Sequence, residues 1–192
     1  MDKLNPFALL KRIERLAHAG HRQLPHQIED QSRWSGIIFR IGTQEVVSAL
    51  TEIGEVLPYP TVFRIPGAKF WLKGIANFRG NLLTLVDLQG FLNGIPTPRD
   101  RRNRVLVVNH AEMSTGFLVD EVIGLRHFKR EAEIPLPKTW IEAALLPYLQ
   151  PGFERTLEDP MSLLGSALKK RYVPIFGLCA LIDSPQFMQV AA

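Results

Sequence analysis

Hydrophobic and polar residues alternate in short runs along most of the chain after Trp34. Ile37, Phe39 and Ile41 occupy every second position, which is typical of a strand with one buried face. Similar short runs, each bounded by glycine or proline, predict further strands at residues 45–50, 53–57, 62–65, 75–78, 82–86, 105–108, 117–119, 122–128 and, as the last strand, 173–182. Strands this short and closely spaced favour barrels or sandwiches over βαβ units, so the chain is predicted to be mainly β.

Helical spacing replaces the alternation in a few segments. Residues 5–19 are predicted to form an amphipathic helix, with Asn5 as its N-cap and Gly20 as its end. Packing on the chain's own core is the favoured role of this helix, and binding to a membrane or a partner is the alternative. Polar residues then predict a linker up to residue 33. Shorter helices are predicted at residues 88–92, 140–146 and 160–170.

The length of 192 residues allows one large domain or two small ones that share a core. Two barrel-like halves fit this length, and the proline- and arginine-rich residues 94–103 are the predicted junction. The single cysteine, Cys179, cannot form an internal disulfide, which favours a reducing compartment. No apolar run approaches the roughly 18 residues of a membrane span, and charged residues interrupt the apolar N-terminal segment. We therefore expect a cytoplasmic globular protein without a signal peptide.

The net charge of +4 and the pI of about 9.4 raise the question of nucleic-acid binding. The densest basic run contains Arg99, Arg101, Arg102 and Arg104, and no aromatic residue is interleaved with it to stack on bases. A solvated loop is therefore the favoured interpretation. A small-barrel nucleic-acid-binding protein remains the alternative function, and a salt series would test it.

Motifs for catalysis are mostly missing from the sequence. The chain contains no P-loop, no G-x-G-x-x-G after a strand and no G-x-S-x-G elbow. Ser166 and Lys169 match S-x-x-K, but the companion motifs of a serine hydrolase are missing. His18, His21 and His26 lack cysteine or carboxylate partners at zinc-site spacing. We therefore predict no catalytic residue, no metal site and no cofactor.

One segment has a more specific pattern, from Gly74 to Leu88. Gly74 allows close backbone approach, Gly80 supplies a hairpin turn with Asn81, and Asn77 can bond to the local backbone. Asp87 is placed to cap a helix that starts at the next residue. Arg79, beside the turn glycine, should project its guanidinium outward, where it suits a carboxylate or carbonyl of another chain. An internal salt bridge of Arg79 is the alternative.

This segment, Ile75-Ala76-Asn77-Phe78-Arg79-Gly80-Asn81-Leu82-Leu83-Thr84-Leu85-Val86-Asp87-Leu88, resembles the signature of CheW-like domains, and Pro66-Gly67 and Leu72-Lys73-Gly74 precede it as that signature requires. Gly116-Phe117-Leu118-Val119-Asp120-Glu121-Val122 is similar to the second signature of the family, G-x-x-V-D-x-V. The resemblance extends from Gly36 to the last strand, in the order of the family. It implies two five-stranded SH3-like barrel subdomains on a shared core.

The resemblance also implies a function. CheW-like proteins are adaptors without enzymatic activity that join the cytoplasmic tips of transmembrane chemoreceptors to the regulatory domain of a CheA-like histidine kinase. The family's kinase-facing surfaces lie on the outer ends of the barrels. Its receptor-facing site, matched by motif, corresponds in this chain to Ile53, Glu55, Val56, Gly74, Asn77, Arg79 and Gly80.

The N-terminal extension, the strand at residues 173–176 and the closing residues 185–191 look like the subfamily of the type IV pilus system, which controls twitching motility. This likeness implies a cytoplasmic protein recruited to inner-membrane chemoreceptor arrays, with no membrane insertion of its own and no nucleic-acid partner. Thr84 stands where the family often has proline, and residues 153–172 are predicted to be a helical insertion before the last strand. The predicted domains are a helix and linker (1–33), a CheW-like domain (34–187) and a C-terminal tail (188–192).

Overall fold

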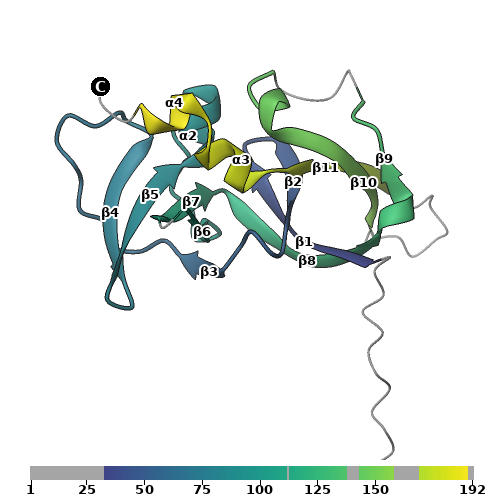
Figure 1. Cartoon of the computed structure of the whole chain (residues 1–192), viewed down its shortest axis with the longest axis horizontal. Helices are drawn as coiled ribbons and strands as arrows, with labels where there is room; N and C mark the ends of the chain where they lie inside the picture. The colour runs from purple at the N-terminus through teal and green to yellow at the C-terminus, as the bar shows by residue number, and fades with distance from the viewer. Residues whose placement is uncertain (1–32, 112, 138–142, 158–168, 190–192) are drawn as a thin grey trace, which may run out of the picture. The chain divides into compact units, whose positions relative to one another are not determined.

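The computed structural model describes residues 33–111, 113–137, 143–157 and 169–189. The predicted N-terminal helix, residues 5–19, lies outside the described residues. Residues 140–142 and 160–168, which are parts of the helices predicted at 140–146 and 160–170, also lie outside them. Of the described remainder, residues 143–145 form a turn and residues 169–170 lie in a strand, so neither part is helical as predicted. The described chain forms two β-sheets and several short helices (Figure 1).

The first sheet has six strands in the order β8-β1-β2-β11-β10-β9. Neighbouring strands in it are antiparallel, except that β2 and β11 are parallel. Its strands, in chain order, are β1 (Arg33–Ile41), β2 (Gln44–Ala49), β8 (Glu121–Lys129), β9 (Glu133–Ile134), β10 (Leu149–Leu157) and β11 (Lys169–Phe176).

The second sheet has five strands in the order β3-β6-β7-β5-β4. Neighbours are antiparallel, except that β5 and β7 are parallel. Its strands are β3 (Glu55–Pro58), β4 (Leu72–Phe78), β5 (Asn81–Asp87), β6 (Arg104–His110) and β7 (Met113–Val119). The helices are α2 (Leu88–Asn93), α3 (Leu178–Ile182), α4 (Pro185–Met188), η1 (Arg130–Ala132) and η2 (Leu146–Tyr148).

The two sheets share one hydrophobic core. Phe39 and Phe176 of the first sheet belong to the same buried cluster as Leu106 and Phe117 of the second. Phe187, from α4, packs against the rings of Trp71, Phe91 and Phe117 in this core. This arrangement confirms the predicted mainly β fold with two barrel-like parts on a common core, with six strands rather than five in the first part.

A fully buried carboxylate, that of Asp87, joins β4, β5 and α2. Asp87 caps α2 as predicted, because its Oδ1 accepts a hydrogen bond from the Gly90 N–H at 3.1 Å. It also accepts bonds from the backbone N–H and the hydroxyl of Thr97, at 3.0 and 2.6 Å. The ammonium of Lys73, on β4, lies 2.7 Å from Oδ2. Four donors therefore satisfy one buried negative charge, as burial of a charge requires.

A second buried carboxylate, that of Glu45, ties β2 to the hairpin of β10 and β11. Its side chain is only 5% exposed, and three guanidinium groups surround it. Arg171 approaches to 2.6 Å, Arg155 to 3.2 Å and Arg40 to 3.6 Å. Because Arg155 and Arg171 are register partners in the hairpin, one anion holds both strands against β2.

The structure corrects several predictions about segments. The helical insertion at 153–172 is wrong at both ends, because residues 153–157 belong to β10 and residues 169–172 to β11. The predicted last strand, 173–182, ends at Phe176, and α3 follows it. Residues 62–65 form only an isolated bridge, between Phe63 and Ile75. The predicted junction at residues 94–103 is also wrong, because this loop connects α2 to β6 within the second sheet.

Candidate functional site

The hairpin between β4 and β5 has a strained two-residue turn. Arg79 and Gly80 are its central residues, with φ of 51° and 86°, and Phe78 pairs with Asn81 across it. Two positive φ values define a type I′ turn, which matches the twist of the strands. The predicted pair Gly80-Asn81 was therefore one residue too late. Asn77 bonds to the backbone as predicted, because its Oδ1 accepts the Gly80 N–H at 3.0 Å.

Arginine at a left-handed position costs roughly 1–2 kcal/mol relative to the usual conformation. Such strain concentrates where the side chain is used for function. The turn lifts the Arg79 guanidinium over the Phe78 ring, with its central carbon 5.0 Å from the ring centroid. Local backbone geometry thus sets the direction of this charge.

Arg79 forms an ion pair with Glu55, at the start of β3. The Arg79 Nη2 donates to Glu55 Oε1 at 2.8 Å, and the two side chains are 71% and 32% exposed. The outward projection and the internal salt bridge that were alternatives in the sequence are therefore both present. An exposed pair of this kind stabilises the fold by only about 0–1 kcal/mol. Its main effect is therefore to fix the position of the Arg79 guanidinium beside Glu55.

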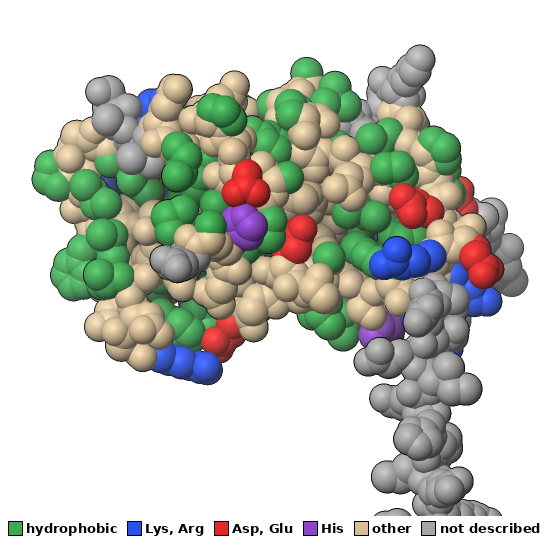
Figure 2. All heavy atoms as spheres, viewed as in Figure 1, with side chains coloured by type: hydrophobic (Ala, Val, Ile, Leu, Met, Phe, Trp, Pro, Cys, Tyr) green, Lys and Arg blue, Asp and Glu red, His purple; other side chains and the backbone are tan. Residues whose placement is uncertain are grey.

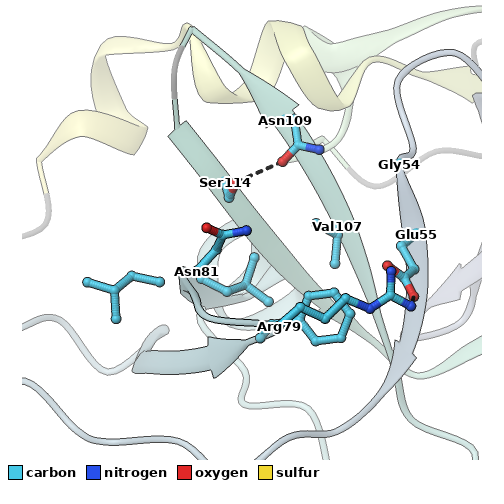
Figure 3. A pocket seen from close by; sticks show the side chains of 10 residues that line it. Gly54, Glu55, Arg79, Asn81, Val107, Asn109 and Ser114 are labelled. Atoms are coloured by element: carbon cyan, nitrogen blue, oxygen red, sulfur yellow. Dashed lines mark hydrogen bonds and ion pairs between the residues drawn. The ribbon is translucent and has the colours of Figure 1, made fainter.

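A pocket of about 230 Å³ opens beside this ion pair (Figure 3). It is bounded by β3, by the β4–β5 hairpin and by the neighbouring ends of β6 and β7. We call it the Arg79 pocket, and it is lined by Gly54, Glu55, Phe78, Arg79, Asn81, Leu82, Leu83, Val107, Asn109 and Ser114. Its walls thus combine an ion pair, apolar side chains and neutral polar groups.

The predicted site residues have different positions relative to this pocket. Glu55 and Arg79 line it, and Gly80 and Asn77 shape the turn beside it. Gly74 does not line the pocket; it is buried near the start of β4, where a Cβ would collide with the Phe63 carbonyl. Gly74 therefore allows the loop after β3 to lie against β4, as its predicted close approach requires.

Two predicted site residues contribute little surface. Ile53 is only 7% exposed and belongs to the shared core, so it cannot be part of an apolar docking patch. Its position before β3 explains the difference, since strand alternation does not apply there. Val56 is partly buried and packs on the same core.

Sequence reasoning missed Leu82, which is 71% exposed on the rim of the pocket. A signal for it existed, because Leu83 and Leu85 face inward and Leu82 must then face outward. Asn109 and Ser114 were missed as well. Nothing local in the sequence indicates that the ends of β6 and β7 reach the β4–β5 hairpin.

Outside this pocket, two described titratable groups at and near α3 have raised pKa values. Burial raises the pKa of the Cys179 thiol, and the nearby Glu52 and Asp183 carboxylates raise it further. Burial also raises the pKa of Glu52, whose Oε2 accepts the Leu178 N–H at 2.9 Å. The thiol is thus held in its unreactive form on α3. Among the described residues, no three His, Cys, Asp or Glu side chains cluster as a metal site would require.

The arginine run forms local contacts in the loop before β6. Arg102 forms two hydrogen bonds to Asp100 Oδ2, at 3.2 and 2.8 Å, and this arginine lowers the pKa of Asp100 to about 2. Arg104 donates to the carbonyls of Arg101 and Asn103. Arg99 lies over the Tyr59 ring, 5.6 Å from its centroid. These contacts fit the predicted loop, because three of its arginines bind groups within the chain.

Comparison with known proteins identifies the family of this chain. The family model described as CheW-like domain matches residues 35–145, and the chain therefore belongs to the CheW-like family. It is 42% identical over 155 residues to Protein PilI of Pseudomonas aeruginosa, covering 80% of this chain and 86% of PilI.

More distant relatives are also CheW proteins. The chain is 27% identical over 123 residues to Chemotaxis protein CheW of Helicobacter pylori, covering 64% of this chain and 72% of that protein. The crystal structure of the scaffolding protein TtCheW from Thermoanaerobacter tengcongensis aligns with a TM-score of 0.62 at 15% identity, covering 80% of this chain and 94% of TtCheW. This structural likeness confirms the CheW-like fold. None of the helices in the described part of the chain is long and apolar enough to cross a bilayer.

Proposed function

We propose that this protein is a non-enzymatic adaptor that couples the cytoplasmic tip of a transmembrane chemoreceptor to a CheA-like histidine kinase in the type IV pilus system. Family membership and the similarity to PilI support this proposal. The observation that carries it is the exposed Arg79–Glu55 pair beside a partly apolar pocket. The adaptor works in the cytoplasm, at receptor arrays of the inner membrane.

Such an adaptor transmits a signal by binding alone. A change in the receptor reaches the kinase only if the adaptor binds the two receptor states with different affinities. The Arg79 pocket suits this role, since its apolar walls supply affinity and its charges supply orientation and partner choice. The remaining donors of the Arg79 fork suit a carboxylate or carbonyl of the receptor.

Replacing Arg79 with alanine is expected to weaken receptor binding by roughly tenfold, the usual cost of losing an interfacial arginine. Its thermal stability should change little, because the pair with Glu55 is exposed. Calorimetric titration with the cytoplasmic fragment of the receptor from the same genome measures the receptor affinity of each variant directly. Arg126→Ala is the matched control, because Arg126 is an exposed arginine on β8. Equal affinities of the Arg79 variant and the wild type would remove Arg79 from the interface.

An adaptor needs a second surface, and we propose the β3–β4 loop for the kinase. This loop surface comprises Phe63, Arg64, Ile65, Lys69 and Phe70. Its three apolar side chains are 71%, 39% and 55% exposed, in chain order, and Arg64 and Lys69 have no carboxylate partner among the described residues. Figure 2 shows hydrophobic side chains gathered over the part of this face that carries β4. Exposed aromatic residues with cations are typical of protein interfaces.

The double variant Phe63→Ser/Phe70→Ser is expected to lose at least tenfold in affinity for the kinase regulatory domain, since two exposed apolar anchors are removed. Its affinity for the receptor fragment should stay unchanged, in contrast to Arg79→Ala. Leu125→Ser provides the control, because Leu125 is an exposed apolar residue of the first sheet. Surface plasmon resonance with each immobilised partner separates the two effects. Unaltered kinase binding by the double variant would exclude the loop as the kinase surface.

A further inference from the structure

We infer that this protein binds a nucleoside monophosphate in two adjoining pockets beside the β3–β4 loop. The first pocket, of about 420 Å³, lies between the end of β3, this loop, the start of β4 and the loop after α2. The second pocket, of about 300 Å³, lies further along the β3–β4 loop. Arg64 and Lys73 line both pockets, which shows that they adjoin, and neither pocket shares a lining residue with the Arg79 pocket.

The charge of this site suits an anion. Among the described residues, the lining of the two pockets contains four cations, Arg64, Lys69, Lys73 and Arg99, and no carboxylate. Asp87 balances the charge of Lys73, whose ammonium lies 2.7 Å from its Oδ2. Arg64 and Arg99 are exposed, and neither forms an ion pair with a carboxylate in the described part of the chain. A hollow lined by one sign of charge concentrates the opposite charge, and two guanidinium forks match the oxygens of a phosphate.

The walls that carry the two arginines are held in place before any ligand binds. The Arg99 guanidinium lies over the Tyr59 ring, with its central carbon 5.6 Å from the ring centroid. On the other wall, Phe63 and Ile75 exchange two backbone hydrogen bonds, at 2.8 and 2.9 Å, directly before Arg64. A site that is already ordered loses less conformational entropy when the ligand binds.

The size and the apolar part of the site indicate more than a phosphate ion. The larger pocket falls within the range of small-molecule sites, about 300–1,000 Å³, and the exposed Thr61 in its lining offers a hydroxyl to a sugar. The smaller pocket is lined by Phe70, which is 55% exposed, together with Ile65 and Ala68. Nucleic-acid bases stack on aromatic side chains whatever their identity, because every base has a π-face. The phosphate therefore belongs beside Arg64 and Arg99, and the base against Phe70.

Titration of the isotope-labelled full chain, followed by NMR, tests this assignment with AMP, GMP, ribose 5-phosphate and inorganic phosphate as probes. AMP and GMP are expected to shift the amide signals of Thr61, Arg64 and Phe70, with a Kd of about 1 mM or below. Ribose 5-phosphate should bind roughly tenfold more weakly because it lacks the stacking base, and inorganic phosphate more weakly still. More salt should weaken the binding of all four probes.

Two variants separate the phosphate contact from the base contact. Arg99→Gln should lower the affinity for AMP roughly tenfold. Phe70→Ser should lower the affinity for AMP to that for ribose 5-phosphate and leave the affinity for ribose 5-phosphate unchanged. Arg126→Gln and Leu125→Ser are the matched controls, because both residues are exposed on β8. Urea denaturation checks that each variant is folded.

Three results would overturn the assignment. Signals that stay in place with AMP and GMP up to about 10 mM would show that no nucleotide site exists. Inorganic phosphate that binds as tightly as AMP, or an Arg99→Gln variant with the wild-type affinity, would indicate an adventitious ion only. A labelled single-stranded oligonucleotide that binds where AMP does not would indicate a nucleic-acid surface instead. The full chain alone is the sample, so failure here would leave the proposed adaptor function untouched.

Discussion

Replacing Asp87 with alanine is expected to lower the free energy of unfolding by about 3–5 kcal/mol, the cost of breaking a buried charge pair. The carboxylate is fully buried and has four donors. Alanine would leave the Lys73 ammonium and the Thr97 N–H and hydroxyl without their acceptor. It would also remove the N-cap of α2, which is worth about 1 kcal/mol by itself.

Urea denaturation, followed by circular dichroism, measures this loss. Asp87→Asn should be less damaging than alanine, since its amide oxygen still accepts from two of the four donors. It should nevertheless destabilise the fold, because the negative charge opposite Lys73 is lost and the amide NH2 faces the other two donors. Asp100→Ala is the control, because Asp100 forms its ion pair with Arg102 on the exposed loop, and its midpoint should stay close to the wild type. A loss below about 1 kcal/mol for Asp87→Ala would contradict the proposal that this buried carboxylate stabilises the junction of β4, β5 and α2.

The local structure of the second sheet could be predicted because local signals and tertiary packing agree there. In β5, alternation predicts that Leu83 and Leu85 face inward, and both are buried. In α2, Asp87 starts the helix and Gly94 ends it, as side-chain capping and a left-handed glycine require. Where the helix cap, the strand alternation and the turn residues indicate the same structure, a single sequence is sufficient to predict that structure.

The predictions failed where long-range pairing decides the structure. Phe153 and Val173 face each other in the β10–β11 hairpin, and Phe153 stacks on Phe128 with ring centroids 4.4 Å apart. No local pattern within residues 153–172 indicates that Phe153 pairs with Val173 or stacks on Phe128. Local composition alone therefore predicted a helix there. Residues 173–182 form one apolar run, and periodicity alone cannot divide such a run into a strand and a helix.

The site was only partly predictable for the same reason. Arg79 could be recognised from its turn, since a long cation beside a hairpin glycine must point outward. Glu55 entered the predicted site only through the resemblance to the family, and Asn109 and Ser114 did not enter it. The parallel pairing of β5 with β7 brings these distant segments together, and such a crossover has no signature in either strand.

Replacing Glu45 with glutamine is expected to destabilise the protein by about 2–3 kcal/mol. Removing one partner of a buried ion pair usually costs 3–5 kcal/mol, and we lower this value because the Arg40 and Arg171 side chains are 33% and 44% exposed. The substitution keeps the shape but removes the anion between three guanidinium groups, which then repel one another. The hairpin of β10 and β11 would lose its electrostatic attachment to β2.

A double-mutant cycle with Arg155 distinguishes this mechanism from a simple packing defect. Arg155 is the least exposed of the three arginines, at 17%. Arg155→Gln should destabilise the wild type, because a buried carboxylate loses a donor. In the Glu45→Gln background it should be neutral or stabilising, since it then removes an unbalanced charge.

Salt provides an independent check on the same cycle. At 1 M salt the Debye length falls to about 3 Å, so repulsion among the arginines should weaken and Glu45→Gln should recover part of its stability. Additive effects in the cycle, together with no response to salt, would show that Glu45 acts through packing alone. The non-additive result would mean that one buried carboxylate keeps the last two strands in the first sheet. The attachment of the β10–β11 hairpin to β2 would then depend on this charge as well as on apolar burial.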